Sequence, residues 1–280
     1  MNNPLMDVIG QSYISNQESI NYDLNREVRE EAIRTVKENT EFVVLTPFNL
    51  NIGKKSEKVR SNSIEYHKWL DSRIEIFNKH TVNSIKSQVI EFDEWGILLE
   101  YPYDIRETLK IKEMIKGYDK INPYYMSGEG KDIDEIEYEI RPKKINYKIK
   151  CQRENYIKKY IATTRLDSDD KLGAMYMYNL IKAIYFLQNS SNIKRNEHYL
   201  FNMPYGLKEK MVDSLDIVDK KQHYFGDNCF TTLLAPWSSS KNIFSFPHDV
   251  VPRDIKKIDI ITREPAWSQI VHEQNIINSW

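Results

Sequence analysis

The stretch YIATTRLDSDDKL, residues 160–172, points most directly to the fold and to a site. It opens with apolar and β-branched residues typical of a buried strand and then places Asp167, Asp169 and Asp170 within four residues. Acids at the carboxyl end of a strand lie where open α/β sheets bind ligands. Clustered carboxylates repel one another unless a cation lies among them, and Mg²⁺ and Mn²⁺ prefer oxygen ligands. The alternative is an acidic turn that caps the following helix.

The composition is typical of a soluble globular protein. The 280 residues suffice for one large α/β domain or two small ones, with 40% hydrophobic and 29% charged residues. A formal net charge of −1 gives no electrostatic argument for nucleic acid or for a membrane surface. Cys151 and Cys229 stand far apart, which argues against a disulfide scaffold and a structural zinc site. We recognise neither a signal peptide nor an apolar run of membrane-spanning length, so we expect a cytoplasmic location.

Strand and helix patterns alternate over the first two-thirds of the chain, which predicts a largely parallel sheet. We expect an N-terminal extension with a helix over residues 1–40 and a single α/β domain over residues 41–280, with a mixed, mostly parallel sheet flanked by helices. The expected strands are 41–50, 95–101, 123–126, 160–166, 198–203, 211–218 and 228–234. The expected helices are 25–39, 63–88 with a break near Thr81, 104–117, 172–188 and 267–278, and residues 127–150 are expected to form a solvated loop.

Five segments in this order carry a resemblance to a known family. They are FVVLTPFNL (42–50), WLDSRIEIFNKHTVNSIKSQ (69–88), WGILLEY (95–101), TTRLDSDDKL (163–172) and WSQIVHEQN (267–275). Together they resemble the bacterial putative rhamnosyltransferase family over roughly residues 42–276. This resemblance implies a nucleotide-sugar glycosyltransferase with the GT-A fold, which is related to the Rossmann fold.

The resemblance gives the acidic segment a specific role. Asp167-Ser168-Asp169 matches the DxD motif, whose carboxylates hold Mn²⁺ or Mg²⁺ against the diphosphate of the donor. By analogy Asp169 is the direct metal ligand, and Asp167 faces the donor ribose, or the metal through a water molecule. Arg165 either adds positive charge near the pyrophosphate or pairs with Asp167 or Asp170. A metal there stabilises the leaving nucleoside diphosphate as a Lewis acid.

Further site residues follow from the other matched segments. Thr46 and Phe48 correspond to the place where such enzymes accommodate the nucleoside, the alternative being a simple strand-to-loop turn. Arg73 is a candidate for binding the diphosphate, and a salt bridge on the helix surface is the alternative. His272 is expected to approach the metal or the diphosphate. Within a helix over 267–278 it would face the same way as Asn275, whereas Trp267 is expected to be a packing anchor.

An inverting transfer also needs a carboxylate that deprotonates the acceptor hydroxyl. Asp227, Asp249 and Glu264 are available, and we favour Asp227. A retaining enzyme would need no such base.

Three functions follow as hypotheses. The first is a metal-dependent transfer of a sugar, rhamnose by family name, from a nucleoside-diphosphate donor to a bacterial surface glycan or a lipid-linked glycan. This hypothesis allows peripheral association with membrane-bound assembly machinery and involves no nucleic acid. The second is a non-catalytic nucleotide- or sugar-binding module of a polysaccharide assembly. The third is another metal-dependent nucleotide-processing enzyme, against which stands the lack of a GxxxxGK[ST] phosphate loop and of an HxxxH or HD metal cluster.

Overall fold

The computed structural model describes residues 26–48, 63–100, 105–126, 145, 149, 158–190, 194, 196–212, 214–226, 228–246, 252 and 254–272. The strands are β1 (Thr40–Pro47), β2 (Glu94–Glu100), β3 (Ile121–Met126), β4 (Tyr160–Arg165), β5 (Lys171–Leu172), β6 (His198–Asn202), β7 (Tyr205–Met211), β8 (Ile217–Tyr224), β9 (Thr232–Pro236), β10 (Ile255–Asp259) and β11 (Trp267–Val271). The helices are α2 (Arg26–Asn39), α4 (Ser63–Ile76), the π-helix η1 (Phe77–Val82), α5 (Asn83–Lys86), α6 (Ile105–Ile115) and α9 (Tyr176–Asn189).

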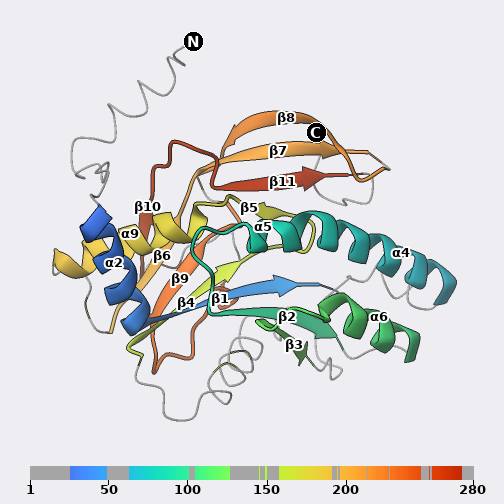
Figure 1. Ribbon diagram of the computed structural model, residues 1–280. Helices are drawn as coiled ribbons and strands as arrows, with labels where there is room; N and C mark the ends of the chain where they lie inside the picture. The colour runs from blue at the N-terminus through green and yellow to red at the C-terminus, as the bar shows by residue number, and fades with distance from the viewer. Residues whose placement is uncertain are drawn as a thin grey trace.

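A seven-stranded sheet of order β10-β6-β9-β4-β1-β2-β3 forms the centre of the described part, and a four-stranded sheet of order β5-β11-β7-β8 lies above it in Figure 1. In the large sheet β1 runs parallel to β2 and β4, and β2 runs parallel to β3. Only β9 is antiparallel to its neighbours, β4 and β6. The expected α/β fold with a mixed, mostly parallel sheet flanked by helices is therefore confirmed.

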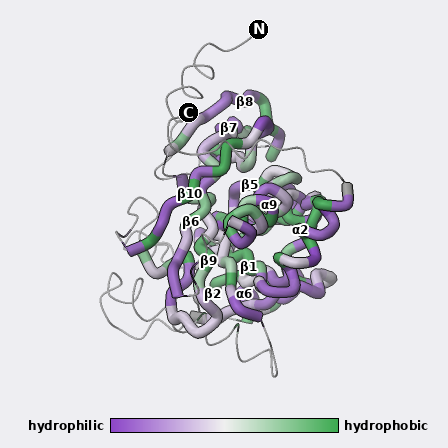
Figure 2. Tube along the Cα trace, turned by 90° about the vertical axis from the view of Figure 1, so that its left-hand side faces the viewer, coloured by the Kyte–Doolittle hydropathy of each residue, from purple (hydrophilic) through white to green (hydrophobic). Residues whose placement is uncertain are grey.

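The central strands are buried because both faces of the large sheet are covered. Residues 40–46 of β1 are all buried, as the apolar residues 42–45 predict for a parallel strand covered on both sides. One face packs against α2, α4 and α9 through residues such as Val36, Leu70 and Ile184. Figure 2 shows hydrophobic residues gathered around β1 and β9, whereas much of β8 and β10 is hydrophilic. No helix among the described residues is long and apolar enough to cross a membrane.

On the opposite face of the large sheet, two residues of the segment 127–150, which was expected to be a solvated loop, are buried. Ile145 and Ile149 are helical and fully buried in a cluster with Val43, Leu98 and Tyr124. The interpretation of residues 127–150 as a solvated loop was therefore wrong at these two positions. Their spacing of four residues places both on one face of a helix, a signal that the surrounding charged residues concealed. The rest of that segment lies outside the described residues.

Two expected elements near the end of the chain were also wrong. Residues 267–271 form strand β11, which pairs with β5 and β7, and not the start of a helix. The expected strand 211–218 is instead the end of β7, a turn and the start of β8. Leu215 in that turn has a φ of 61°, an unusual conformation for a residue with a side chain. Asp213 and Ser214 were the turn signal within this apolar run.

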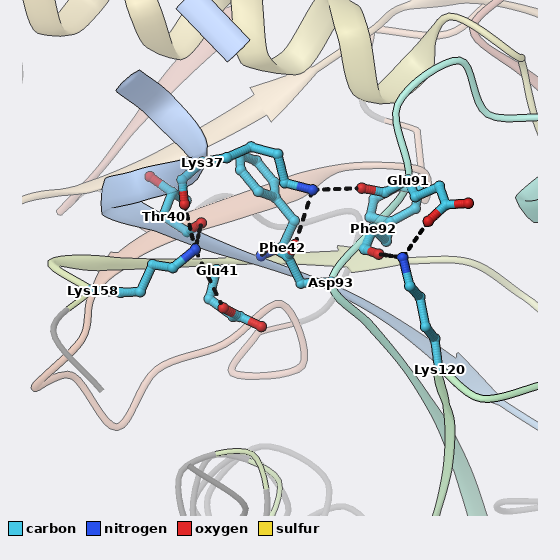
Figure 3. Close-up of polar contacts among 9 residues, drawn as sticks. All are labelled: Lys37, Thr40, Glu41, Phe42, Glu91, Phe92, Asp93, Lys120 and Lys158. Carbon is cyan, nitrogen blue, oxygen red and sulfur yellow. Dashed lines mark hydrogen bonds and ion pairs between the residues drawn. The ribbon is translucent and has the colours of Figure 1, made fainter. Parts of the chain in front are cut away.

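Three lysines, Lys37, Lys120 and Lys158, form hydrogen bonds and ion pairs near the amino-terminal ends of the central strands (Figure 3). Lys158 donates to the carbonyl oxygens of Lys37 and Thr40 and lies 3.7 Å from the buried carboxylate of Glu41. Its side chain is only 16% exposed. It therefore joins the end of α2 to β1 from a site with little solvent screening.

We expect Lys158→Ala to lower the free energy of unfolding by about 1–3 kcal/mol, because buried acceptors lose their donor and Glu41 loses a nearby positive charge. Lys120→Ala is the control. Lys120, in the same view, donates to the Phe92 carbonyl oxygen and to the Glu91 carboxylate from a side chain that is 51% exposed. Exposed pairs contribute about 0–1 kcal/mol. Urea denaturation of both variants measures the difference, and equal losses would contradict this account.

Trp267 anchors the small sheet to the large one, as expected. Its ring is 2% exposed, stacks on Phe230 at 4.7 Å between centroids, and donates from Nε1 to the Met203 carbonyl oxygen at 2.7 Å. The ring also covers Gly206 so closely that a Cβ atom there would lie 2.2 Å from it. This strand position therefore requires glycine.

We expect Gly206→Ala to destabilise the protein by about 2–4 kcal/mol, since a buried indole has to move. Gly226→Ala is the control, because a Cβ atom there would meet nothing within 4 Å. Thermal denaturation of both variants is the measurement. A Gly206→Ala midpoint close to that of the unchanged chain would show that Trp267 does not lie against this glycine.

Candidate functional site

The acidic segment forms a tight turn at the carboxyl end of β4, between the two sheets. The amide of Asp170 donates to the Asp167 carbonyl oxygen at 3.1 Å, and the amide of Leu166 donates to Leu45 of β1 at 3.1 Å. The chain then enters β5, where Lys171 pairs with Ser268 of β11. The turn therefore lies where the large parallel sheet ends, the expected place for a ligand.

The helical segment after α4 holds this turn in place. Thr81 Oγ1 donates to the Ser168 carbonyl oxygen at 3.0 Å, and Ser84 Oγ accepts from the Leu172 amide at 3.2 Å. Gln88 Nε2 donates to the Gly173 carbonyl oxygen at 2.8 Å. Thr81 lies in the π-helix η1, close to the break expected from the sequence, and such turns recur at functional sites. The middle of the acidic segment and the residues directly after it are thus attached to η1, to α5 and to Gln88 just beyond α5.

Asp169 brings together three residues that the sequence had singled out. Its Oδ2 lies 2.6 Å from Arg73 Nη1 of α4 and 3.0 Å from His272 Nε2, directly after β11. Burial alone would raise the pKa of Asp169, but Arg73 and His272 together lower it to about 2. Asp169 is therefore a carboxylate at neutral pH. The roles predicted for these three residues stay predictions.

Asp170 is the most buried of the three acids, at 3% exposure. One oxygen, Oδ1, accepts from the Ile270 amide of β11 at 2.8 Å. Burial and the neighbouring carboxylates of Asp169 and Asp167 hold the pKa of Asp170 well above its usual range. This side chain ties the turn to the small sheet, and its ionised form is costly to bury unless a positive charge compensates it.

Asp167 forms an ion pair with Arg165, two residues earlier in the chain. Arg165 Nε donates to Asp167 Oδ1 at 3.1 Å, and its guanidinium lies 5.5 Å from the Phe244 ring centroid. Of the two roles considered for Arg165, the ion pair with Asp167 is present. A contact with a diphosphate stays a prediction.

Cys229 is a site residue that the sequence analysis missed. Its sulfur and one carboxylate oxygen each from Asp167 and Asp170 all lie within 4.8 Å of one another. Burial and the two nearby carboxylates raise the pKa of the Cys229 thiol well above its usual range. A cysteine 59 positions after Asp170 gives no spacing signal, so only the fold reveals this contact.

These donors fit a divalent cation of the manganese type. Asp167 and Asp170 each use one oxygen in a hydrogen bond with described residues, which leaves the other for a metal. Carboxylate oxygen suits Mg²⁺ and Mn²⁺, and sulfur adds a softer donor. A bound cation would offset the repulsion within the acidic turn.

The two residues expected to contact the nucleoside are both buried. Thr46 has no exposed surface, and its Oγ1 accepts from Trp95 Nε1 at 2.9 Å. Phe48 is 4% exposed and packs edge-on against Phe77 at 5.4 Å. Contact with a base would require these side chains to move, and their role stays a prediction.

The candidate catalytic bases Asp227, Asp249 and Glu264 stay untested. Asp227 and Asp249 lie outside the described residues. Glu264 is exposed in the loop before β11, where its carbonyl oxygen accepts from the Thr262 hydroxyl at 2.7 Å.

Comparison with known proteins agrees with the family resemblance drawn from the motifs. A family model described as "Putative rhamnosyl transferase" matches residues 42–279. No curated protein matches significantly. The expected membership of a glycosyltransferase family is thereby confirmed.

Solved structures of S. aureus TarS 1–349 are similar at low identity. The structure of that protein alone is 13% identical, with a TM-score of 0.34 over 82% of this chain. Its complex with UDP-GlcNAc is 12% identical, with a TM-score of 0.37 over 85% of this chain. Its complex with UDP is 12% identical, with a TM-score of 0.34 over 83% of this chain. In each case the match spans 60% of the TarS chain.

We expect Arg73 and Asp169 to be coupled by about 1–3 kcal/mol in a double-mutant cycle of Arg73→Met and Asp169→Asn, because both side chains are only 16% exposed. The control cycle is Lys110→Met with Asp71→Asn, an ion pair between α6 and α4 whose side chains are 30% and 55% exposed. That pair should couple by about 0–1 kcal/mol. Denaturant unfolding gives both values, and no coupling between Arg73 and Asp169 would contradict the proposed contact.

Proposed function

Because the chain belongs to the "Putative rhamnosyl transferase" family, we propose that it is a metal-dependent glycosyltransferase that uses a nucleoside-diphosphate sugar. The observation that carries this proposal is the meeting of Asp169, Arg73 and His272 at the carboxyl end of β4. Three segments far apart in the sequence supply an acid, a guanidinium and an imidazole to one place. Such a set suits a diphosphate and its counter-cation.

Arg73 supports a role in binding the diphosphate. Its Nε is buried and has no hydrogen-bond partner in the described part of the chain. Buried unpaired donors are rare and call for an explanation. A phosphate oxygen of the donor would satisfy this N–H, while Asp169 keeps the guanidinium in place from the other side.

The proposed reaction breaks the bond between the anomeric carbon and the phosphate oxygen of the donor. A bond forms between that carbon and an acceptor hydroxyl oxygen, whose proton is lost. A cation at the acidic turn, Mn²⁺ or Mg²⁺, would supply Lewis-acid stabilisation of the leaving diphosphate. Arg73, Arg165 and His272 add positive charge around the same group. Asp227 remains the proposed base for an inverting transfer.

We propose a bacterial surface glycan or a lipid-linked glycan as the acceptor, and rhamnose as the transferred sugar on the family description alone. The protein would act in the cytoplasm, peripherally associated with membrane-bound assembly machinery. The donors to be tested include UDP-GlcNAc, the nucleotide sugar bound in one TarS structure.

The test is a thermal-shift panel of UDP-, GDP-, CMP- and dTDP-linked sugars, each with Mn²⁺ and with EDTA. A donor at about 100 times its Kd stabilises by about 2.7 kcal/mol, which raises the midpoint of a chain of this size by roughly 5 °C. One nucleotide class should stabilise the protein, and EDTA should abolish the effect. Nucleotide release on adding a glycan acceptor would then separate a transferase from a binding module, which binds without turnover.

We expect Asp169→Asn to weaken donor binding at least about tenfold, because Arg73 and His272 lose their charged partner. Asp219→Asn, an exposed acid on β8, is the control and should bind like the unchanged chain. Circular dichroism confirms that both variants fold. Undiminished donor affinity in folded Asp169→Asn, with metal present, would count against this site.

A further inference from the structure

We propose that Cys229 binds the divalent cation directly, together with Asp167 and Asp170. This inference rests on the proposed function for the presence of a cation and names its ligands. The three donor atoms lie within 4.8 Å of one another. Metal bonds of about 2.1–2.4 Å place ligand atoms roughly 3–4.5 Å apart. Small side-chain rotations would therefore complete the site.

Both acids of this set are held in place by hydrogen bonds that leave one oxygen for a metal. Asp167 Oδ1 accepts from Arg165 Nε at 3.1 Å, and Asp170 Oδ1 accepts from the Ile270 amide at 2.8 Å. Outer contacts of this kind orient metal ligands. The two carboxylates are therefore oriented before a metal binds.

Hydrogen bonds of the two neighbouring residues, Asn228 and Phe230, fix the position of Cys229. Asn228 Nδ2 donates to Asn202 Oδ1 at 2.6 Å and to the Met203 carbonyl oxygen at 3.0 Å. The Phe230 amide donates to Asn228 Oδ1 at 2.8 Å, and the Phe230 carbonyl oxygen accepts from Tyr176 at 2.8 Å. The residues before and after Cys229 are thus locked by buried hydrogen bonds. Such support pre-organises the thiol for its role as a ligand.

The distribution of charge explains why the cation would lie beside Asp170 and not beside Asp169. Asp169 already shares Oδ2 between Arg73 and His272. Asp167 pairs with Arg165. Asp170 is buried and makes no ion pair with the described residues, so it is the acid that lacks a compensating charge. In the proposed set Asp169 and His272 hold each other and do not bind the metal directly.

Binding through sulfur has a distinct chemistry. The Cys229 thiol loses its proton to solvent as the metal–sulfur bond forms. A thiolate is a softer ligand than a carboxylate, so the site should favour Mn²⁺ and Co²⁺ over Mg²⁺. This preference distinguishes the proposed set from one made of carboxylates alone.

The test is a Co²⁺ titration in the Cys151→Ser background, where Cys229 is the only thiol. We expect a near-ultraviolet thiolate-to-cobalt charge-transfer band that saturates with one Co²⁺ per chain. Adding Cys229→Ser should abolish the band and weaken Co²⁺ and Mn²⁺ binding about tenfold or more, with a smaller effect on Mg²⁺. Cys151→Ser alone should bind metal like the unchanged chain.

A second measurement avoids any variant at the site. In the Cys151→Ser chain, Mn²⁺ should slow alkylation of Cys229 at least about tenfold and EDTA should restore the rate, because a metal-bound thiolate is not free to react. Saturable Co²⁺ binding without the band, unchanged by Cys229→Ser, would overturn the inference and leave metal-dependent transfer standing. Donor binding that persists in EDTA, with no Co²⁺ binding at all, would overturn both the role of Cys229 as a metal ligand and the metal dependence of the proposed transfer.

Discussion

The carboxylate of Asp169 is the point on which the arrangement of this protein depends. It joins the turn after β4, the helix α4 through Arg73, and the small sheet through His272. A partly buried carboxylate is stable only when it is paired and hydrogen-bonded, so these three pieces have to meet in one geometry. Two further hydrogen bonds stabilise the same place: Thr81 donates to the Ser168 carbonyl oxygen, and Asp170 accepts from the Ile270 amide.

Around this point the fold gathers three acidic side chains close together and gives each its own contact. Three carboxylates share one turn, and each contacts a different partner: a main-chain amide for Asp170, Arg165 for Asp167, and a guanidinium with an imidazole for Asp169. The groups are therefore oriented before a ligand arrives. Electrostatic stabilisation of a developing charge depends on such pre-orientation, because little reorganisation remains during the reaction.

Sequence patterns predicted the large sheet well and the small sheet poorly, for a physical reason. The strands at 40–47 and 160–165 are rich in apolar and β-branched residues and almost fully buried, since both faces of a parallel sheet are covered. In contrast, WSQIV at 267–271 is short and pairs with strands far away in the sequence. Its spacing also fits a helix, and only the partners β5 and β7 decide between the two. Ile145 and Ile149 show the same dependence, because burial alone reveals their helical face.

The sequence by itself determined the class of the fold, the family and the acidic turn, because these depend on local runs of residue types. It also singled out Arg73, Asp169 and His272, although not the contact among them. Only the tertiary structure decided which acid pairs with which base and that Cys229 lies beside Asp167 and Asp170. Side chains this far apart along the chain meet through strand order and helix packing, which no local pattern encodes.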